Sequence, residues 1–229
     1  MAVKIESSKA KQSIIFEVLV ALFITSLIIS NILSVRIVNI SFLTFDGGTI
    51  LFPLAYIISD IITEIYGFKK MRQLIYIGIS MLGIMAVCFY IAQYLPADSH
   101  NLVNKEAYLS VLGVAWRVVI ASIAALFIGD FINSYVLAYL KIKTEGKAIW
   151  FRVIGSTAIG SLIDTILFTV IAFLGSLSGN ELLKIIATVY FIKIATEVII
   201  SPITISIIKY IKLSDNIDIY EKPHLRLKG

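Results

Sequence analysis

Eight charged residues lie inside long apolar runs of this sequence, where an ionised side chain needs compensation. They are Glu17, Asp60, Glu64, Arg117, Asp130, Asp164, Lys193 and Glu197. On insertion scales each would cost roughly 2.5–3.5 kcal/mol at the centre of a lipid bilayer, so a partner, a water-filled cavity or a bound ligand must offset it. Because the acids outnumber the bases, the pattern favours protons, cations or a donor-rich ligand as the compensation.

The second apolar run carries two of these acids at helical spacing. Asp60 and Glu64 are four residues apart, which places them one turn apart on the same helix face. Tyr56 and Phe52 extend this row, so the predicted helix presents a stripe of two aromatic and two acidic side chains. Neither acid has a base within its own run, and function is therefore the favoured reading for both.

Acids of the last two runs have neighbours at the same spacing. Asp164 has Phe168 one turn away, and Lys193 precedes Glu197 by four residues. A mutual ion pair between Lys193 and Glu197 and a role for them in ligand binding are both open readings. Since the two intramembrane bases, Arg117 and Lys193, lie on other runs than the acids of runs two and five, the pattern predicts a cluster between helices.

The elements that carry these charges are expected to be membrane-spanning helices. The chain has 229 residues, of which 59% are hydrophobic, and its mean hydropathy is +0.93, whereas soluble domains are roughly 45–50% apolar. A span needs about 20 apolar residues. Six runs qualify: 14–35, 48–66, 72–95, 111–140, 152–175 and 185–211. The sequence thus predicts an all-α integral membrane protein with a bundle of six transmembrane helices.

Basic residues predict the orientation of these spans. Fifteen of the 20 Lys and Arg fall in the two tails and the connections after spans two and four, and three fall on the other side. Because positive loops stay in the cytoplasm, we expect both termini there. The predicted organisation is an amino tail (1–13), a six-span transport domain (14–211) and a carboxyl tail (212–229).

Two patterns concern the packing of the helices. Asp60 and Asp164 lie in spans that run in opposite directions, where a three-plus-three inverted repeat would place equivalent acids; we leave that repeat open. Small residues favour close contact between helices. They recur at Ala121, Ala125, Gly129, Gly155 and Gly160.

Sequence motifs give no support for enzymatic chemistry. The chain has no phosphate-binding GxxxxGK[ST] loop, no HExxH and no GxSxG. The single cysteine, Cys88, has no partner for a disulfide, and His100 and His224 lack metal-ligand spacing. We therefore expect no enzyme activity, no metal and no cofactor. Since the positive charge lies in short membrane-flanking segments, direct nucleic-acid binding is not expected either.

Several short motifs resemble the bacterial queuosine precursor transporters, also called the vitamin uptake transporter family. The motifs are Ser30–Ser34, Gly47–Pro53, Asp60 with Glu64, Tyr66–Gly67 with Lys69, Arg117 with Ala121–Ser122, Gly129–Asn133, Ser161–Asp164 with Phe168, and Lys193 with Glu197 and Pro202. The resemblance covers about residues 14–211. It implies import of a 7-cyano- or 7-aminomethyl-7-deazaguanine across the cytoplasmic (inner) membrane for queuosine salvage in tRNA.

The residues suit such a ligand. A 7-deazaguanine presents a ring N–H beside an exocyclic amino group, and this pair of donors matches one carboxylate; its flat ring can stack on aromatic side chains, and a base can donate to its carbonyl. With the resemblance, the candidate substrate site is Asn31, Phe52, Tyr56, Asp60, Glu64, Arg117, Asp164, Phe168, Lys193 and Glu197.

Other readings stay open at this point. The chain would also fit the substrate-binding subunit of an energy-coupling factor importer, which needs an ATPase and a transmembrane partner. The same fold could carry queuine or queuosine instead. An intramembrane enzyme with Asp60 and Asp164 as an acid pair lacks any supporting motif. Whether the protein forms a homo-oligomer is open too.

Overall fold

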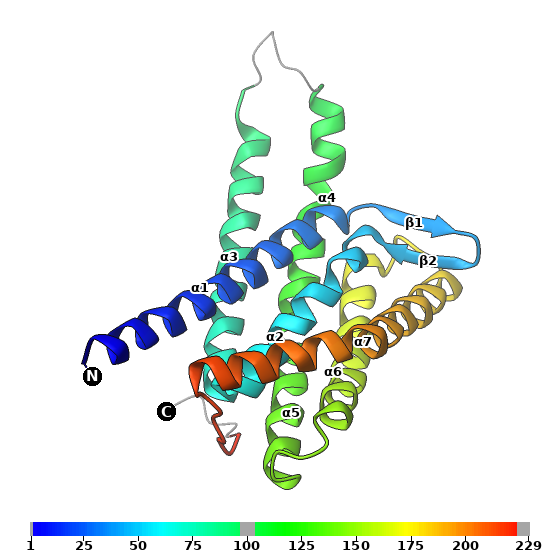
Figure 1. Cartoon of the computed structure of the whole chain (residues 1–229). Coiled ribbons are helices and arrows are strands. Elements are labelled where there is room, and N and C mark those ends of the chain that lie inside the picture. Colours follow the sequence, from blue (N-terminus) through cyan, green and yellow to red (C-terminus); the bar gives the residue numbers. More distant parts are fainter. Residues whose placement is uncertain (1, 97–103, 224–229) are drawn as a thin grey trace.

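The computed structural model describes residues 2–96 and 104–223, which form helices joined by short connections (Figure 1). The elements are α1 (Ala2–Leu33), β1 (Ile37–Ile40), β2 (Leu43–Asp46), the 3-10 helix η1 (Gly47–Ile50), α2 (Phe52–Tyr66), α3 (Phe68–Tyr94), α4 (Lys105–Ala125), the π-helix η2 (Leu126–Asp130), α5 (Phe131–Lys143), α6 (Ile149–Phe173) and α7 (Gly179–Asp215). The described chain is thus mostly helical. The hairpin β1–β2 departs from the predicted all-α class.

Five helical stretches are long and apolar enough to cross a membrane, which makes this a multi-pass membrane protein. They are Ile14–Leu33, Phe68–Tyr94, Lys105–Lys143, Ile149–Phe173 and Gly179–Asp215. The predicted span 48–66 differs from these, because its residues form η1 and then α2, a helix of 15 residues. Such a helix is about 22 Å long, shorter than the hydrocarbon core of about 30 Å. The predicted set of six uniform spans is therefore not confirmed.

Helix α2 lies in the interior of the bundle. Every residue from Ile58 to Tyr66 is buried, and α1, α3, α5 and α7 all contact it. A helix that is apolar and buried around its whole circumference must be enclosed by other helices. The acidic stripe of α2 consequently faces protein and not lipid.

Contacts at the helix termini define two ends of the bundle. At one of them, which we name the tail end, Phe16 of α1 packs edge-to-face on Tyr66 of α2, with ring centroids 5.0 Å apart. The segment after α7 reaches the same end, where the Ile219 amide donates to a backbone carbonyl of α2. At the opposite, hairpin end, Gly47 lies against the carbonyl of Leu33. Helix α2 therefore runs from the hairpin end to the tail end, antiparallel to α1.

The hairpin anchors the start of α2. Phe45 of β2 packs on Ile185 of α7, and Asp46 accepts hydrogen bonds from Ser34 Oγ (2.5 Å) and Thr49 Oγ1 (2.9 Å). These bonds tie the end of α1 to η1. As a result, the first turn of α2 has a fixed position at the hairpin end.

The fourth predicted span is a continuous helix with a π segment inside it. Helices α4 and α5 join through η2, which ends at the buried Asp130. A π segment inserts an extra residue into the helical ladder and often marks a functional site.

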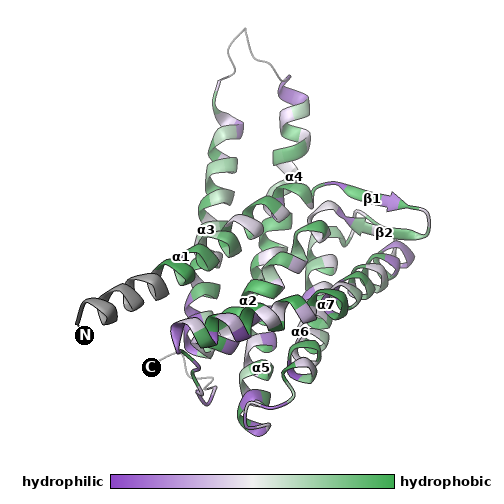
Figure 2. Cartoon of the chain, viewed as in Figure 1, coloured by the Kyte–Doolittle hydropathy of each residue, from purple (hydrophilic) through white to green (hydrophobic). Residues whose placement is uncertain are grey.

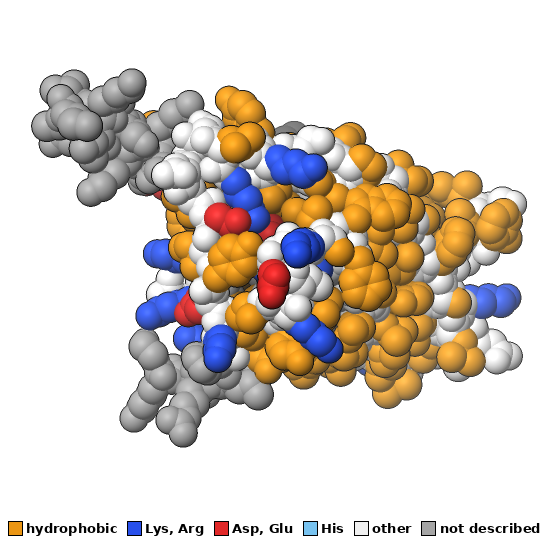
Figure 3. All heavy atoms as spheres, turned by 60° about the horizontal axis from the view of Figure 1, so that its bottom comes forward, with side chains coloured by type: hydrophobic (Ala, Val, Ile, Leu, Met, Phe, Trp, Pro, Cys, Tyr) orange, Lys and Arg blue, Asp and Glu red, His pale blue; other side chains and the backbone are white. Residues whose placement is uncertain are grey.

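Large apolar side chains cover the outer faces of the helices. Tyr94, Phe191 and Ile199 are 72%, 66% and 74% exposed, which is expected where the neighbour is lipid. Hydropathy colouring shows apolar helices with polar residues concentrated near their ends and in the connections (Figure 2). In Figure 3 a broad apolar surface covers much of the molecule, and most visible Lys and Arg side chains lie on one half of it.

Two of the predicted small residues hold α6 against the π segment and α5. A Cβ added to Gly129 would lie 2.5 Å from the Cβ of Asp164, and one added to Gly160 would lie 2.6 Å from the Cβ of Asn133. Gly155, by contrast, has nothing within 4 Å of such a Cβ. The predicted packing role is thus confirmed at Gly129 and Gly160 and is wrong at Gly155.

Gly160→Ala should destabilise the fold, because the added methyl group overlaps Asn133. Overpacking of this kind costs about 1–3 kcal/mol. Gly155→Ala is the matched control on the same helix: with open space beside it, the change should be neutral or stabilise α6 by up to about 1 kcal/mol. Melting temperatures of the two purified variants in detergent measure the difference. Equal stability of both would contradict the close contact.

Candidate substrate site

Asp60 lies in the interior of the bundle, and its hydrogen-bond donors among residues 2–96 and 104–223 are neutral. The side chain is fully buried. Asn133 Nδ2 of α5 donates to Oδ1 over 2.9 Å, and Thr157 Oγ1 of α6 donates to Oδ2 over 3.4 Å. These bonds join α2, α5 and α6 at one point. The expected contact of Asp60 with other helices is present, but its partners are polar and uncharged.

Asp164 and Lys193 form a buried ion pair between α6 and α7. The Lys193 ammonium also lies over two rings of α2, 4.2 Å from the centroid of Phe52 and 5.4 Å from that of Tyr56. Such cation–π contacts stabilise a cation more when water is excluded. Phe168 packs edge-to-face on Phe52, with centroids 6.2 Å apart. The site thus combines an ion pair with three aromatic rings.

Two small cavities lie beside this ion pair. The first, of about 20 Å³, is lined by Asn31, Phe52, Tyr56, Asp130, Asp164 and Phe168, among others. The second, of about 10 Å³, is lined by residues that include Tyr56, Thr157, Lys193, Thr196 and Glu197. A cavity of this size holds about one water molecule. The structure is therefore closed around the site, and helices or side chains must move before a heterocycle can enter.

Several buried polar atoms on the helices that enclose the cavities have no hydrogen-bond partner in the part of the chain that the structure describes. They are Asn31 Oδ1, Tyr56 OH, Asn133 Oδ1, Ser161 Oγ and Glu197 Oε1. Leaving a polar group buried and unpaired costs about 1–3 kcal/mol, and proteins rarely keep such groups without a use for them. This set offers acceptors and hydroxyl groups to a ligand with several N–H donors.

Of the ten predicted site residues, eight lie around these cavities. Asn31, Phe52, Tyr56, Asp164, Phe168 and Lys193 surround the first cavity and the ion pair, and Asp60 and Glu197 lie on the side of the second. The sequence left open whether Lys193 pairs with Glu197. In the structure, Lys193 pairs with Asp164 instead.

Arg117 lies apart from this cluster and closes the end of α6. Its Nε donates to the carbonyl of Ile171 over 3.0 Å, and its Nη2 donates to the carbonyl of Leu174. The last carbonyls of a helix lack internal partners and carry partial negative charge. The contacts of Arg117 are therefore those of a helix C-terminal cap at the hairpin end.

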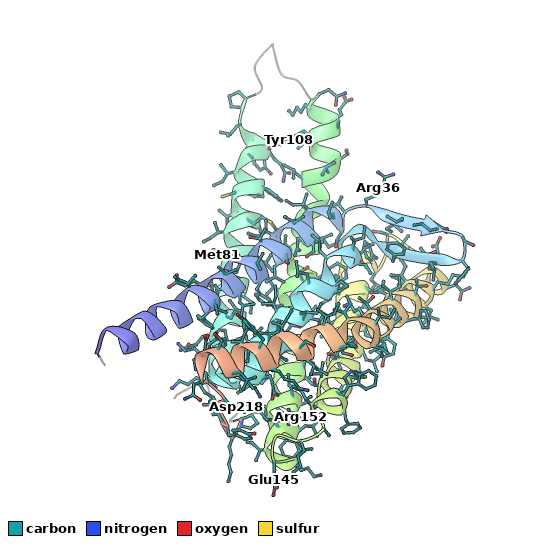
Figure 4. All side chains as sticks on the ribbon, in the orientation of Figure 1. Arg36, Met81, Tyr108, Glu145, Arg152 and Asp218 are labelled. Atoms are coloured by element: carbon teal, nitrogen blue, oxygen red, sulfur yellow. The ribbon has the colours of Figure 1, made fainter. Side chains whose placement is uncertain are left out.

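Glu64 also lies apart, in a cluster of charges at the tail end. Its Oε1 is 2.8 Å from Arg152 Nη2 and 2.7 Å from Lys212 Nζ, and Lys141 Nζ lies 3.9 Å away. Both lysines also bind Asp218, at 2.6 and 2.9 Å. Figure 4 shows Arg152 and Asp218 near each other at the lower end of the bundle. Although Glu64 shares a helix face with Asp60, its partners are structural cations.

The charges around Asp218 keep that carboxyl ionised. Partial burial raises its pKa, but the hydrogen bonds from Lys141 and Lys212 outweigh this and leave the pKa below its usual value. The tail segment is held further by Lys141 Nζ, which lies 4.5 Å from the ring centroid of Tyr220. The segment after α7 is thus fastened to α2 and α5.

Sequence reasoning missed four residues of the two clusters. Asn133 and Thr157 were not singled out, although both are polar residues inside apolar runs. Asp130 is among the charges inside the apolar runs but not in the predicted site, yet it is buried and lines the first cavity. Arg152, at the start of the fifth predicted span, is not in the predicted site either, and its side chain is fully buried beside Glu64. Polar residues one or two turns from a buried acid are the signal that would have found the first two.

Glu64→Gln should be among the more destabilising single changes at the tail end, because it leaves three cations around one remaining acid, Asp218. Removing one partner of a buried ion pair costs about 3–5 kcal/mol. Arg152→Met should cost less, since Lys212 still neutralises Glu64, and combining both changes should recover part of the loss. Melting temperatures in detergent measure these differences.

The chain supplies a matched pair of exposed charges as a control. Glu145 and Lys147 are 3.8 Å apart and more than 80% exposed, and exposed pairs contribute about 0–1 kcal/mol. Glu145→Gln should therefore leave the melting temperature nearly unchanged. Strictly additive losses in the Glu64→Gln/Arg152→Met double variant would contradict the pairing.

Comparisons with known proteins identify the family. The family model described as "Putative vitamin uptake transporter" matches residues 46–207. A Bacillus subtilis (strain 168) protein named "Probable queuosine precursor transporter" is 29% identical over 175 residues, 76% of each chain. A Haemophilus influenzae protein of the same name is 26% identical over 126 residues, 55% of this chain and 51% of its own length. No solved structure matches the chain. The resemblance seen in the motifs is confirmed, and the chain belongs to the vitamin uptake transporter family.

Proposed function

We propose that this protein imports a queuosine precursor, a 7-cyano- or 7-aminomethyl-7-deazaguanine, across the cytoplasmic membrane. The observation that carries the proposal is the buried site itself, in which an ion pair, three aromatic rings and unpaired acceptors meet between α1, α2, α6 and α7. Both relatives bear the name of a queuosine precursor transporter. The protein acts as a carrier and not as an enzyme.

The ligand would bind as a flat ring between aromatic side chains. Phe52 and Phe168 offer faces for stacking, and Lys193 would donate to the ring carbonyl. The paired N–H donors of the ligand need a carboxylate, and Asp130 and Asp164 border the first cavity. Because Lys193 already pairs with Asp164, the substrate would enter by exchanging partners within this pair.

We further propose that α2 serves as a sixth crossing and that both termini lie in the cytoplasm. The antiparallel course of α1 and α2 between the same two ends supports the crossing. The 15-to-3 distribution of basic residues supports the orientation, with the six-crossing transport domain at 14–211 between the two tails. The short α2 is compatible with this role because other helices enclose it.

A reporter that is active only in the cytoplasm should give signal when fused after Gly229 and none when inserted at His100. The two sites lie outside the described residues, in the segments that the charge distribution assigns to opposite sides. Reporter activity normalised to the amount of fusion protein is the measurement. Signal from the His100 insertion would overturn the orientation.

A second candidate is the substrate-binding subunit of an energy-coupling factor importer, and the small closed site would suit a binding subunit as well. Reconstitution of the purified chain alone into liposomes separates the two. Uptake without an ATPase or a transmembrane partner would rule out an obligate subunit. Uptake only with such partners would rule out the independent carrier.

Feeding candidate precursors to cells that carry this gene identifies the substrate. A strain that cannot make its own queuosine precursors receives this gene and then 7-cyano-7-deazaguanine, 7-aminomethyl-7-deazaguanine, queuine or queuosine separately. Queuosine in tRNA is the readout, with the empty vector as control. We expect modification with one or both of the first two. A chain that supports modification with none of them does not have the proposed function.

A further inference from the structure

Among the described residues, four carboxyl groups around the two cavities share that region with the ammonium group of one lysine. The acids are Asp60, Asp130, Asp164 and Glu197, all of them buried. The ammonium belongs to Lys193, and it pairs with Asp164. Among the described residues, no Lys or Arg nitrogen lies within ion-pair distance of the other three acids. Three uncompensated carboxylates at this depth are too costly to coexist.

Glu197 has surroundings that suit a charge poorly. It is 3% exposed, and its Oε1 has no hydrogen-bond partner among the described residues. Asp60, in contrast, accepts two hydrogen bonds, and such bonds stabilise a carboxylate. The second cavity connects these two acids, because Thr157 donates to Asp60 and lines that cavity together with Glu197.

The second cavity is distinct from the one proposed for the heterocycle. Its volume of about 10 Å³ allows at most one water molecule, and Lys193 lines it. A metal cation there would lie beside the ammonium and be repelled by it. A proton avoids this repulsion, since it becomes part of a neutral carboxyl group.

From these observations we infer that Glu197 and Asp60 form a proton-binding site that couples substrate import to proton entry; this inference rests on the proposed function. A proton from the outer solution forms an O–H bond with the Glu197 carboxylate before the substrate binds. The bond breaks on the cytoplasmic side, and the proton passes to water as the substrate leaves. One proton enters with each substrate molecule. Lys193 and Tyr56, which border both the substrate site and this cavity, link the two sites.

The other groups that face this pair come from four elements. Helix α2 contributes Tyr56, and Glu64 one turn beyond Asp60, which has its own cations. Helix α6 contributes Asp164, α7 contributes Lys193, and η2 contributes Asp130. The described part of α3 buries an apolar face. Helix α1 contributes the neutral Asn31 to the lining of the first cavity. The proton equilibrium is therefore set by acids and by one lysine that is already paired.

The experiment uses the purified protein in liposomes with a labelled 7-deazaguanine. Without a gradient, exchange of labelled for unlabelled substrate tests transport alone. With an alkaline interior, the wild type should accumulate substrate about tenfold per unit of pH difference, the value for one proton per substrate, and a protonophore should abolish this accumulation. Glu197→Gln should lose the accumulation that the pH difference drives, with its exchange rate measured in parallel, whereas Glu145→Gln, an exposed residue away from the site, should behave as the wild type does.

Infrared spectroscopy supplies a readout that does not need transport. A protonated carboxyl has a carbonyl stretch that a carboxylate lacks, so the wild type should show this band at neutral pH and Glu197→Gln should show less of it. If Glu197→Gln does not fold, Asp60→Asn is measured instead. The carbonyl stretch of the protonated carboxyl should then shift relative to that of the wild type.

The outcomes separate the two proposals. Exchange without accumulation under a pH gradient, or accumulation driven by a sodium gradient, would overturn the inference and leave the proposed function standing. Absence of the carbonyl band from the wild type would overturn the inference as well. If the wild type exchanges none of the 7-deazaguanines, the proposed function fails, and with it the coupling.

Discussion

Asp60→Asn should abolish uptake of the substrate while the protein still inserts and accumulates in the membrane. The side chain is fully buried and holds Asn133 and Thr157 in place. An asparagine has the same shape and keeps one acceptor, so the fold should survive. It cannot ionise or carry a proton, and it cannot accept a pair of donors. Removal of a charged group from a buried hydrogen-bonded site costs about 2–5 kcal/mol, which corresponds to a loss of uptake of about 30-fold to 4,000-fold.

The measurement is the initial rate of uptake in cells, divided by the amount of protein in the membrane fraction. Glu145→Gln serves as the matched control, because it removes an exposed acid that no site uses. Transport by Asp60→Asn at the wild-type rate would remove Asp60 from the site. Poor accumulation of the variant would instead indicate that the two hydrogen bonds hold the fold together.

Hydropathy predicts most of the fold, because the bilayer fixes the length and the composition of a spanning helix. The exception is α2, since an enclosed helix does not need the full length of the hydrocarbon core. Hydropathy does not predict the hairpin either, because strands of four residues are too short to give a clear period-2 pattern. The π segment packs closely on Asp164 of another helix at Gly129, a contact that no local pattern records.

Burial of the acids could be predicted from sequence, whereas their partners could not. Glu64 meets Arg152, 88 positions along the chain, because both lie at the tail end once the helices pack. Lys193 has Glu197 at helical spacing, but it turns toward Asp164 on the neighbouring helix. Spacing along one helix indicates which ion pairs are geometrically possible. The rotation of each helix about its axis determines which of these ion pairs form.

The pair of Asp164 and Lys193 gives the second large expected effect. Lys193→Met removes the cation that pairs with the buried Asp164, and Asp164→Leu removes the anion that pairs with the ammonium over the rings of Phe52 and Tyr56. Each single change should cost about 3–5 kcal/mol. The double variant Lys193→Met/Asp164→Leu should be better folded than either single variant, because neither member of the pair is left behind as a lone charge. Melting temperature in detergent is the measure of folding.

Transport by this double variant separates a structural pair from a substrate contact. We expect transport to be lost despite good folding, since both residues border the first cavity, with Lys193 over the rings that would stack on the ligand. An active double variant would make the pair part of the scaffold and remove both residues from the site. The comparison cycle uses Lys193→Met with Glu197→Leu, the pair that helical spacing allows. Its coupling energy should be smaller than that of Lys193 with Asp164, because coupling is largest between residues in contact, and a larger value would place the ion pair on α7 alone.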